Sequence, residues 1–316
     1  MAQVDDMAIH AESHANNAPN LFVIGAPKSG TTTLYDMLTQ HPQIYMCSPK
    51  EPRFFSRDSE YRKGFNWYID TYFKDKKNYR IRGEATPTYL YLNKKTIPRI
   101  KDCLQDRTSK FIAIFRNPVD RAYSHYWFNR NTKINLQENL SFEEALASEN
   151  QRIHDHPEFY EEGIVSYSYF QTGLYAEQAK TFITGFGRQN CLFLLLEDLF
   201  PDNFQSTVQK IEKFLSIDQL ELKYTRTKES IRFRSKTLTA LFRKSRSLRS
   251  TISHFIPARF RSEMKSTVMN FNNIPFKYPE MRTDTRKILL QKYRPSLIEL
   301  EKVIDRDLTN WTNHEV

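Results

Sequence analysis

The sequence is poor in cysteine and in long apolar runs. Its three cysteines, Cys47, Cys103 and Cys191, are odd in number and follow no regular spacing. This pattern argues against a disulfide framework and favours a reducing compartment. No apolar run approaches the roughly 18 residues that mark a membrane-spanning helix, so we expect no stable membrane insertion.

Targeting and metal-binding signals are also lacking. The N-terminal stretch "MAQVDDMAIHAESHANNAPN" carries acids and no basic segment, so it does not read as a secretory signal. We expect residues 1–18 to form a disordered leader, residues 19–316 to form one domain, and the location to be cytoplasmic. The histidines and cysteines show no metal-ligand spacing, so we expect no metal.

Short apolar runs alternate with helical patterns along the chain. Asn117 precedes Pro118 as a good helix N-cap, and Ser29 or Thr31 can cap an earlier helix. This alternation predicts an α/β, P-loop-like three-layer fold with a central, mainly parallel sheet flanked by helices. The ligand site then lies outside the carboxyl ends of the strands. We predict strands at Leu21–Gly25, Lys110–Phe115 and Cys191–Leu196, a strand entering a loop over Tyr79–Tyr91, and helices at Thr31–Gln40, from Pro118 onward and at Phe204–Leu215.

The stretch "VIGAPKSGTTTL" resembles a phosphate-binding loop whose lysine is displaced. Gly25 and Gly30 have P-loop spacing, but Thr31 stands where a nucleoside triphosphatase has its lysine, and Lys28 lies inside the loop. No aspartate follows the "FIAIF" strand to hold a metal ion. Backbone amides at a helix N-terminus still make a cradle for an anion. The pattern favours a phosphate ester that carries a transferable group, with Lys28 beside the bridging oxygen.

These motifs together resemble the PAPS-dependent sulfotransferases, most closely the heparan-sulfate type and related bacterial enzymes. The resemblance extends from about Leu21 to Trp311. It implies PAPS as the donor, with no metal, and a 5′-phosphosulfate cradle made by Lys28, Ser29, Gly30, Thr31 and Thr32. The stretches that carry it are "PKSGTT" (27–32), "KEPRFFS" (50–56), "GEATPTYLY" (83–91), "FRNPVDRAYSHY" (115–126), "GLYAEQ" (173–178) and "RDLTNW" (306–311).

The "FRNPVDRAYSHY" stretch is similar to the family's 3′-phosphate motif. Arg116 lies at the end of a predicted strand, and Ser124 lies seven residues after Asn117, two helical turns along the same face. Both can therefore reach one anion, and an arginine offers phosphate a bidentate fork. The adjacent His125 faces another side of the helix, so we expect it to pack.

The "KEPRFFS" stretch resembles the segment that carries the family's catalytic glutamate. Glu51 lies between two prolines that limit its backbone, and the pair Phe54-Phe55 anchors the loop. The resemblance implies that Glu51 accepts the acceptor's hydroxyl proton. Lys50 and Glu84 are further candidates on the acceptor side, and Glu84 could equally form a structural ion pair. Ala85 stands where some relatives have lysine, which leaves the acceptor's identity open.

The chain's net charge of +10 is concentrated in one segment. Lys223 to Lys265 holds 13 lysines and arginines against two acids, a local charge of +11. We expect a basic helical or loop segment, closing over the donor site, in which Arg232 and Arg234 are further phosphate ligands. It could also be a solvated face, or bind an anionic membrane or nucleic acid. Aromatic residues are not interleaved with the charges, so we expect no nucleic acid.

The sequence therefore predicts transfer of a sulfuryl group to a hydroxyl of a small secondary metabolite, such as a polyketide or alkaloid, or of a glycan. Two alternatives remain open. A P-loop kinase or nucleoside triphosphatase predicts magnesium-dependent ATP binding. A basic protein that binds nucleic acid or anionic lipid predicts steeply salt-dependent binding without a nucleotide.

Overall fold

A computed structural model gives the structure of the chain. It describes residues 16–105, 107–132, 138–224, 231–233 and 273–312. Residues 1–15 of the expected leader and most of the basic segment 223–265 lie outside the described residues. At the end of the expected leader, the Asn17 side chain accepts a 2.8 Å hydrogen bond from the Lys76 amide and Ala18 is buried. The bounds of the leader stay a prediction.

A five-stranded sheet forms the centre of the structure. Its order is β2-β3-β1-β4-β5, and each neighbouring pair is parallel. This confirms the predicted α/β sheet, including three of its strands from their apolar runs. The strands are β1 Leu21–Gly25, β2 Ile44–Met46, β3 Ile81–Ala85, β4 Lys110–Phe115 and β5 Cys191–Leu195. Strand β2 was not predicted, because three residues carry too little pattern.

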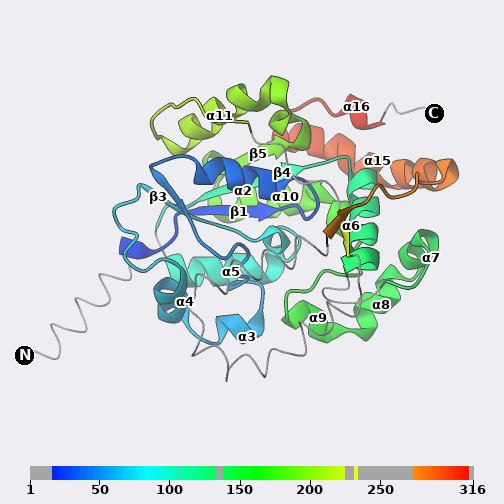
Figure 1. Cartoon of the computed structure of the whole chain (residues 1–316). Coiled ribbons are helices and arrows are strands. Elements are labelled where there is room, and N and C mark those ends of the chain that lie inside the picture. Colours follow the sequence, from blue (N-terminus) through cyan, green and yellow to red (C-terminus); the bar gives the residue numbers. More distant parts are fainter. Residues whose placement is uncertain (1–15, 106, 133–137, 225–230, 234–272, 313–316) are drawn as a thin grey trace, which may run out of the picture. The chain divides into compact units, whose positions relative to one another are not determined.

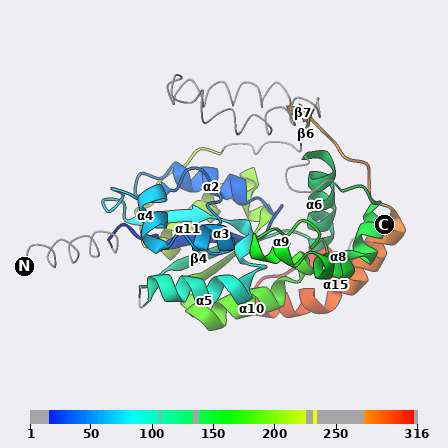
Figure 2. The same ribbon diagram turned by 90° about the horizontal axis from the view of Figure 1, so that it is seen from below.

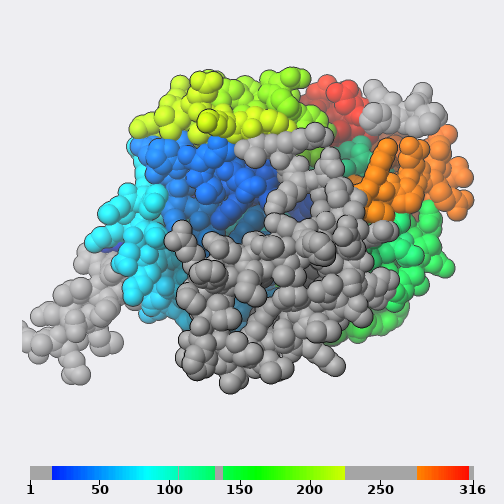
Figure 3. Space-filling view, viewed as in Figure 1, coloured from blue at the N-terminus to red at the C-terminus, as the bar shows by residue number. Residues whose placement is uncertain are grey.

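Helices α2 (Thr31–Thr39) and α11 (Pro201–Leu215) cover one face of the sheet. Leu34, Leu38, Val208 and Ile211 from these helices join Leu21 and Val23 of β1 in one buried cluster. Alternate residues of a strand point to opposite faces, so Phe22 lies on the other side. In Figure 1 α11 lies above the strands and α2 lies in front of them, and their surfaces adjoin in the space-filling view of Figure 3.

Helices α5 (Asn93–Leu104) and α10 (Tyr175–Phe186) pack together on the opposite face (Figure 2). Stacked aromatic rings join this face of the sheet to α10. Phe111 of β4 stacks on Phe22 at 5.4 Å and on Phe186 at 4.1 Å between ring centroids. Helix, sheet and helix therefore make three layers, as predicted.

The remaining elements surround these layers or follow them in the chain. Helix α6 begins at Pro118, and the Asn117 side chain accepts the Val119 amide at 3.0 Å, which confirms the predicted cap. The other elements are α3 Asp58–Tyr61, α4 Phe65–Tyr72, η1 Pro87–Tyr89, α6 Pro118–Thr132, α7 Phe142–Ala147, α8 Glu149–Asp155, α9 Pro157–Glu161, η2 Gln171–Gly173, η3 Arg188–Asn190, η4 Leu196–Leu199, α15 Thr283–Ile304 and α16 Thr309–Thr312.

By its internal contacts the chain divides into two compact units. The first comprises Met1–His125, Leu140–Thr227 and Met281–Val316 and contains the five-stranded sheet. The second comprises Tyr126–Asn139 and Lys228–Glu280, and in it β6 (Ile231–Phe233) pairs antiparallel with β7 (Asn273–Pro275). The single domain expected over residues 19–316 stays a prediction.

Candidate active site

The predicted site residues of the first unit gather where parallel strands end. The phosphate-binding loop follows β1, Arg116 follows β4, and Glu84 lies at the end of β3. Residues 47–57, between β2 and α3, carry Lys50 and Glu51 and are called the Glu51 loop below. Carboxyl ends of parallel strands share one sheet edge, so four chain segments deliver polar groups to the same place.

Gly30 shapes the start of α2. It is the N-cap, with a φ of 96°, and a Cβ atom there would lie 2.7 Å from Cδ1 of Leu196. The predicted capping by Ser29 or Thr31 is wrong, because no side chain hydrogen-bonds to the first-turn amides of α2, all of whose residues are described. Glycine takes the left-handed conformation at low cost, and it leaves the first-turn amides of the helix to face an anion.

Lys28 and Arg116 lie close together with like charge. Arg116 Nη1 donates to the Lys28 carbonyl at 3.4 Å, and the Lys28 backbone has a φ of 68°. Burial first, and then the neighbouring charges of Arg116 and Lys50, lower the pKa of Lys28 to about 8 against the opposing effect of Glu51. A fold that holds two partly buried cations together, one of them at a left-handed backbone position, indicates a site for an anion.

Lys50 lies on the phosphate-loop side of the site. Its ammonium donates to Thr32 Oγ1 at 3.2 Å and to Thr31 Oγ1 at 3.4 Å, and it is 3.6 Å from Glu51 Oε1. Burial lowers the pKa of Lys50, whereas the pairing with Glu51 raises it. The structure therefore places this lysine beside the anion cradle, and its predicted role on the acceptor side stays a prediction.

Glu51 occupies a tightly turned part of its loop. Both Glu51 (φ 62°) and Arg53 (φ 58°) have left-handed backbones, and Arg53 Nη2 contacts Glu51 Oε2 at 2.9 Å. The carboxylate is one-third exposed. Phe54 and Phe55 are fully buried, and Phe54 stacks on Tyr68 at 4.4 Å, so the predicted aromatic anchor of the loop is present.

Glu84 is buried completely. Its carboxylate accepts hydrogen bonds from Tyr68 Oη (2.6 Å), Thr86 Oγ1 (2.8 Å) and Tyr89 Oη (3.1 Å). Burial raises the pKa of Glu84 to about 7, against the effect of these hydrogen bonds. Among the described residues no cation pairs with it, so the alternative of a structural ion pair is not realised there. Its predicted role on the acceptor side stays a prediction.

The other predicted residues have mixed outcomes. Ser124 is buried on α6, and His125 is buried edge-on against Tyr169, which confirms its packing role. Ser29 and Thr31 are buried, whereas Thr32 is exposed at the start of α2. Arg232 lies in β6, whose side chains the structure does not describe, and Arg234 lies outside the described residues.

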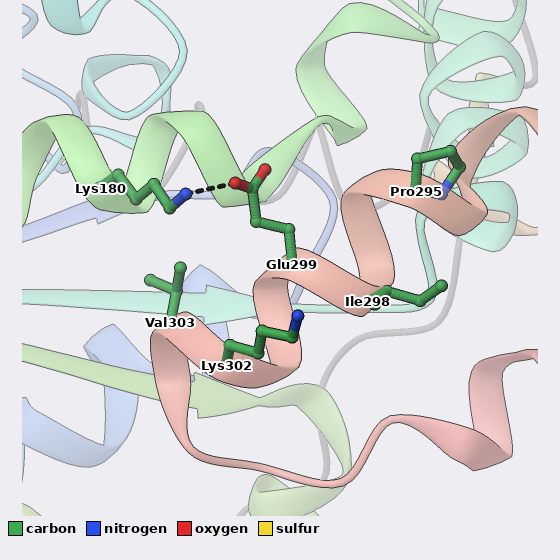
Figure 4. A pocket seen from close by; sticks show the side chains of 6 residues that line it. All are labelled: Lys180, Pro295, Ile298, Glu299, Lys302 and Val303. Atoms are coloured by element: carbon green, nitrogen blue, oxygen red, sulfur yellow. Dashed lines mark hydrogen bonds and ion pairs between the residues drawn. The ribbon is translucent and has the colours of Figure 1, made fainter.

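The described residues lack a metal-binding cluster and a membrane-spanning helix. They contain no group of three or more His, Cys, Asp or Glu side chains placed to hold a metal ion. None of their helices has the length and apolar character needed to cross a membrane. A groove elsewhere in the first unit runs between α10 and α15, where Lys180 pairs with Glu299 (Figure 4).

Comparison with known proteins identifies the arrangement. The family model of the sulfotransferase domain matches residues 18–287. A solved sulfotransferase from Alicyclobacillus acidocaldarius is 28% identical, superposes with a TM-score of 0.66, and the match covers 93% of this chain and 98% of that one. The predicted family resemblance and P-loop-like fold are both confirmed.

Curated relatives match over shorter stretches. A membrane-associated sulfotransferase, kil1, of Dictyostelium discoideum is 39% identical over 138 residues, 42% of this chain and 28% of that protein. The heparan sulfate glucosamine 3-O-sulfotransferase 3A1 of Mus musculus is 28% identical over 223 residues, 69% of this chain and 51% of that protein. The matches therefore span about half or less of these relatives.

Proposed function

This chain belongs to the sulfotransferase family, and from that premise we propose that it moves a sulfuryl group from PAPS to a hydroxyl group of an acceptor. One observation carries the proposal. The fold brings Lys28, Lys50 and Arg116 to one sheet edge at a phosphate-type loop, with the carboxylate of Glu51 next to them. The three cations suit the binding of an anionic donor. The carboxylate beside them suits a base that accepts the proton of the acceptor.

The donor's two ends have separate candidate partners. The amides of the loop, Lys28 and the hydroxyls of Thr31 and Thr32 hold the 5′-phosphosulfate, with Ser29 and Gly30 shaping the turn. Arg116 and Ser124 hold the 3′-phosphate, which distinguishes PAPS from ATP. Arg232 and Arg234 remain candidates for further phosphate contacts. Two observations support the cradle: Gly30 at the start of α2 has a left-handed backbone, and Lys28 is partly desolvated beside Arg116.

The reaction exchanges one sulfur–oxygen bond for another. The acceptor oxygen bonds to sulfur while the bond from sulfur to the phosphate oxygen breaks, and that electron pair leaves on PAP. Lys28 neutralises the charge that grows on the leaving oxygen, with Lys50 close by. Glu51 takes the acceptor's proton. Positioning and charge neutralisation supply most of the catalysis, as in phosphoryl transfer.

The acceptor is proposed at the level of chemical class. A hydroxyl of a glycan or of a small secondary metabolite fits the family, and the mouse relative is named for glucosamine in heparan sulfate. The family resemblance implies that some relatives have lysine at the position of Ala85, so the acceptor's identity stays open. A panel of glucosamine-containing glycans, phenols and alcohols, with amines as a separate arm, identifies the class. We propose a cytoplasmic location for the enzyme.

Thermal denaturation tests the donor assignment directly. PAP without metal is expected to raise the melting temperature, because it binds only the folded state, whereas Mg·ATP is expected to leave it unchanged. Labelled PAPS then reports transfer to the acceptor panel. Stabilisation by Mg·ATP alone would favour the kinase alternative, and salt-sensitive binding to nucleic acid or lipid vesicles without a PAP effect would favour the basic binding protein.

Arg116→Ala is expected to weaken PAP binding about tenfold or more, because a charged hydrogen bond to phosphate contributes about 1.5–3 kcal/mol. Titration calorimetry with PAP measures it. Arg116→Lys keeps the charge without the planar fork, so we expect an affinity between those of Arg116→Ala and the wild type. An affinity for Arg116→Ala within a factor of two of the wild type would remove Arg116 from the donor site.

PAP binding is expected to take up a proton near pH 8. Lys28 has a pKa of about 8 in the protein, and an adjacent anion favours its charged form. Below pH 8 Lys28 is already protonated in the free protein. Above pH 8 the lysine must take up a proton from solution when PAP binds. Affinity should therefore fall as pH rises above about 8. Calorimetry in two buffers of different ionisation enthalpy counts the protons, and Lys28→Met should take up none.

A further inference from the structure

Glu84 is a buried carboxylate at this sheet edge that the proposed mechanism leaves unused. Its three hydrogen-bond donors are the hydroxyls of Tyr68, Thr86 and Tyr89. A hydroxyl has one proton to donate and keeps lone pairs to accept. Each hydroxyl that gives its proton to Glu84 can therefore accept an N–H group from elsewhere.

Two of these hydroxyls accept backbone amides of the Glu51 loop. Tyr89 Oη accepts from the Phe55 amide at 3.2 Å, and Thr86 Oγ1 accepts from the Arg53 amide at 3.4 Å. Arg53 is one of the two residues with a left-handed backbone in this loop, and Glu51 is the other. Such conformations persist only where surrounding contacts hold them.

We propose that Glu84 is a positioning residue that holds the proposed base in place, through the hydroxyls of Thr86 and Tyr89 and the backbone of the Glu51 loop. The ionised carboxylate fixes the direction of both hydroxyl protons, and so fixes which way the lone pairs face. A neutral carboxyl group would donate a proton itself and would turn one hydroxyl away from its amide. This inference rests on the proposed function only where it names Glu51 as the base.

The chain offers a matched control. Tyr68 Oη donates to the same carboxylate at 2.6 Å, and its described hydrogen bond reaches Glu84 and not the backbone of the Glu51 loop. The Tyr68 ring stacks on Phe54, and a phenylalanine keeps that ring. Tyr68→Phe and Tyr89→Phe therefore each remove one hydroxyl from Glu84, but only Tyr89→Phe also removes an acceptor from the loop.

Hydrogen exchange tests the connection without any activity. In Glu84→Gln and in Tyr89→Phe, the amides of residues 53–55 are expected to exchange about tenfold faster or more than in the wild type, whereas Tyr68→Phe should leave them close to the wild type. If Glu84→Gln does not fold, Glu84→Asp replaces it, because aspartate keeps the charge but withdraws the carboxylate from the hydroxyls of Thr86 and Tyr89. Unchanged exchange at these amides, or equal acceleration in Tyr68→Phe, would overturn the proposal.

Kinetics then separate a positioning role from a general loss of structure. With PAP affinity kept within a factor of two, kcat for Glu84→Gln is expected to fall about tenfold, and Glu51→Gln/Glu84→Gln should be no slower than Glu51→Gln. Independent, multiplying losses would overturn the proposal. Failure of the wild type to bind PAP would instead refute the proposed function, and the exchange result would still decide the role of Glu84.

The pH profile gives a third readout. Burial raises the pKa of Glu84 to about 7, so kcat of the wild type should fall as pH drops through 7, and Glu84→Gln should lack this limb. The titratable groups facing Glu84 are Tyr68, Tyr89, Tyr72 and Cys47, and burial raises the pKa of each, so they stay neutral over this range. A limb that persists unchanged in Glu84→Gln would contradict the proposal.

Discussion

Lys28→Met is expected to lower the rate of sulfuryl transfer about 100-fold or more, the scale found when one group that stabilises developing charge is removed. The substitution keeps most of the side chain's length and removes its charge. Lys28 is desolvated beside Arg116, so its charge acts where water screens it little. A transfer assay with labelled PAPS at saturating donor measures kcat separately from donor binding.

The surface pair of Figure 4 supplies the control for this variant. Lys180 pairs with Glu299 in the groove between α10 and α15, and both side chains are about half exposed. Lys180→Met removes the same charge from the same kind of residue, and an exposed ion pair contributes at most about 1 kcal/mol to stability. Its kcat should equal that of the wild type. If Lys28→Met were as active as Lys180→Met, Lys28 would have no part in the chemistry.

Much of the sheet was predictable because its signals are local. The apolar runs of β1, β4 and β5 are long enough to read, and Asn117 with Pro118 marks the start of α6. The cap of α2 was mispredicted for a conformational reason. Hydroxyl residues flank Gly30, but the chain needs a left-handed residue there, and glycine takes that position more readily than either neighbour.

The sequence predicts which residues gather at this sheet edge better than it predicts their contacts with one another. Glu51 and Lys50 were found from one short motif, yet the direction of Lys50 depends on where β2 ends, and β2 itself was missed. The pairing of Arg53 with Glu51 needs two left-handed residues that no propensity predicts. The hydroxyls around Glu84 include Tyr68, 16 residues earlier in the chain, and only the packing of α4 brings it there.

Glu51→Gln is expected to lower kcat about 100-fold or more, within the range found for a positioned acid–base group, while PAP affinity stays within a factor of two. Glutamine keeps the size and can still hydrogen-bond to Arg53, but it does not accept a proton. Glu51 already has cationic partners within the protein: its Oε1 is 3.6 Å from Lys50 Nζ and its Oε2 is 2.9 Å from Arg53 Nη2. We therefore expect the substitution to change kcat more than PAP affinity.

Glu299→Gln serves as the matched control for this variant, since it loses a carboxylate in the exposed pair with Lys180 and should keep full activity. Calorimetry with PAP shows whether Glu51→Gln retains an intact donor site. A kcat near that of Glu299→Gln would remove Glu51 as the base. A loss of PAP affinity that matched the loss of kcat would assign Glu51 to binding instead, because an interaction made only in the transition state lowers kcat without weakening the ground-state complex.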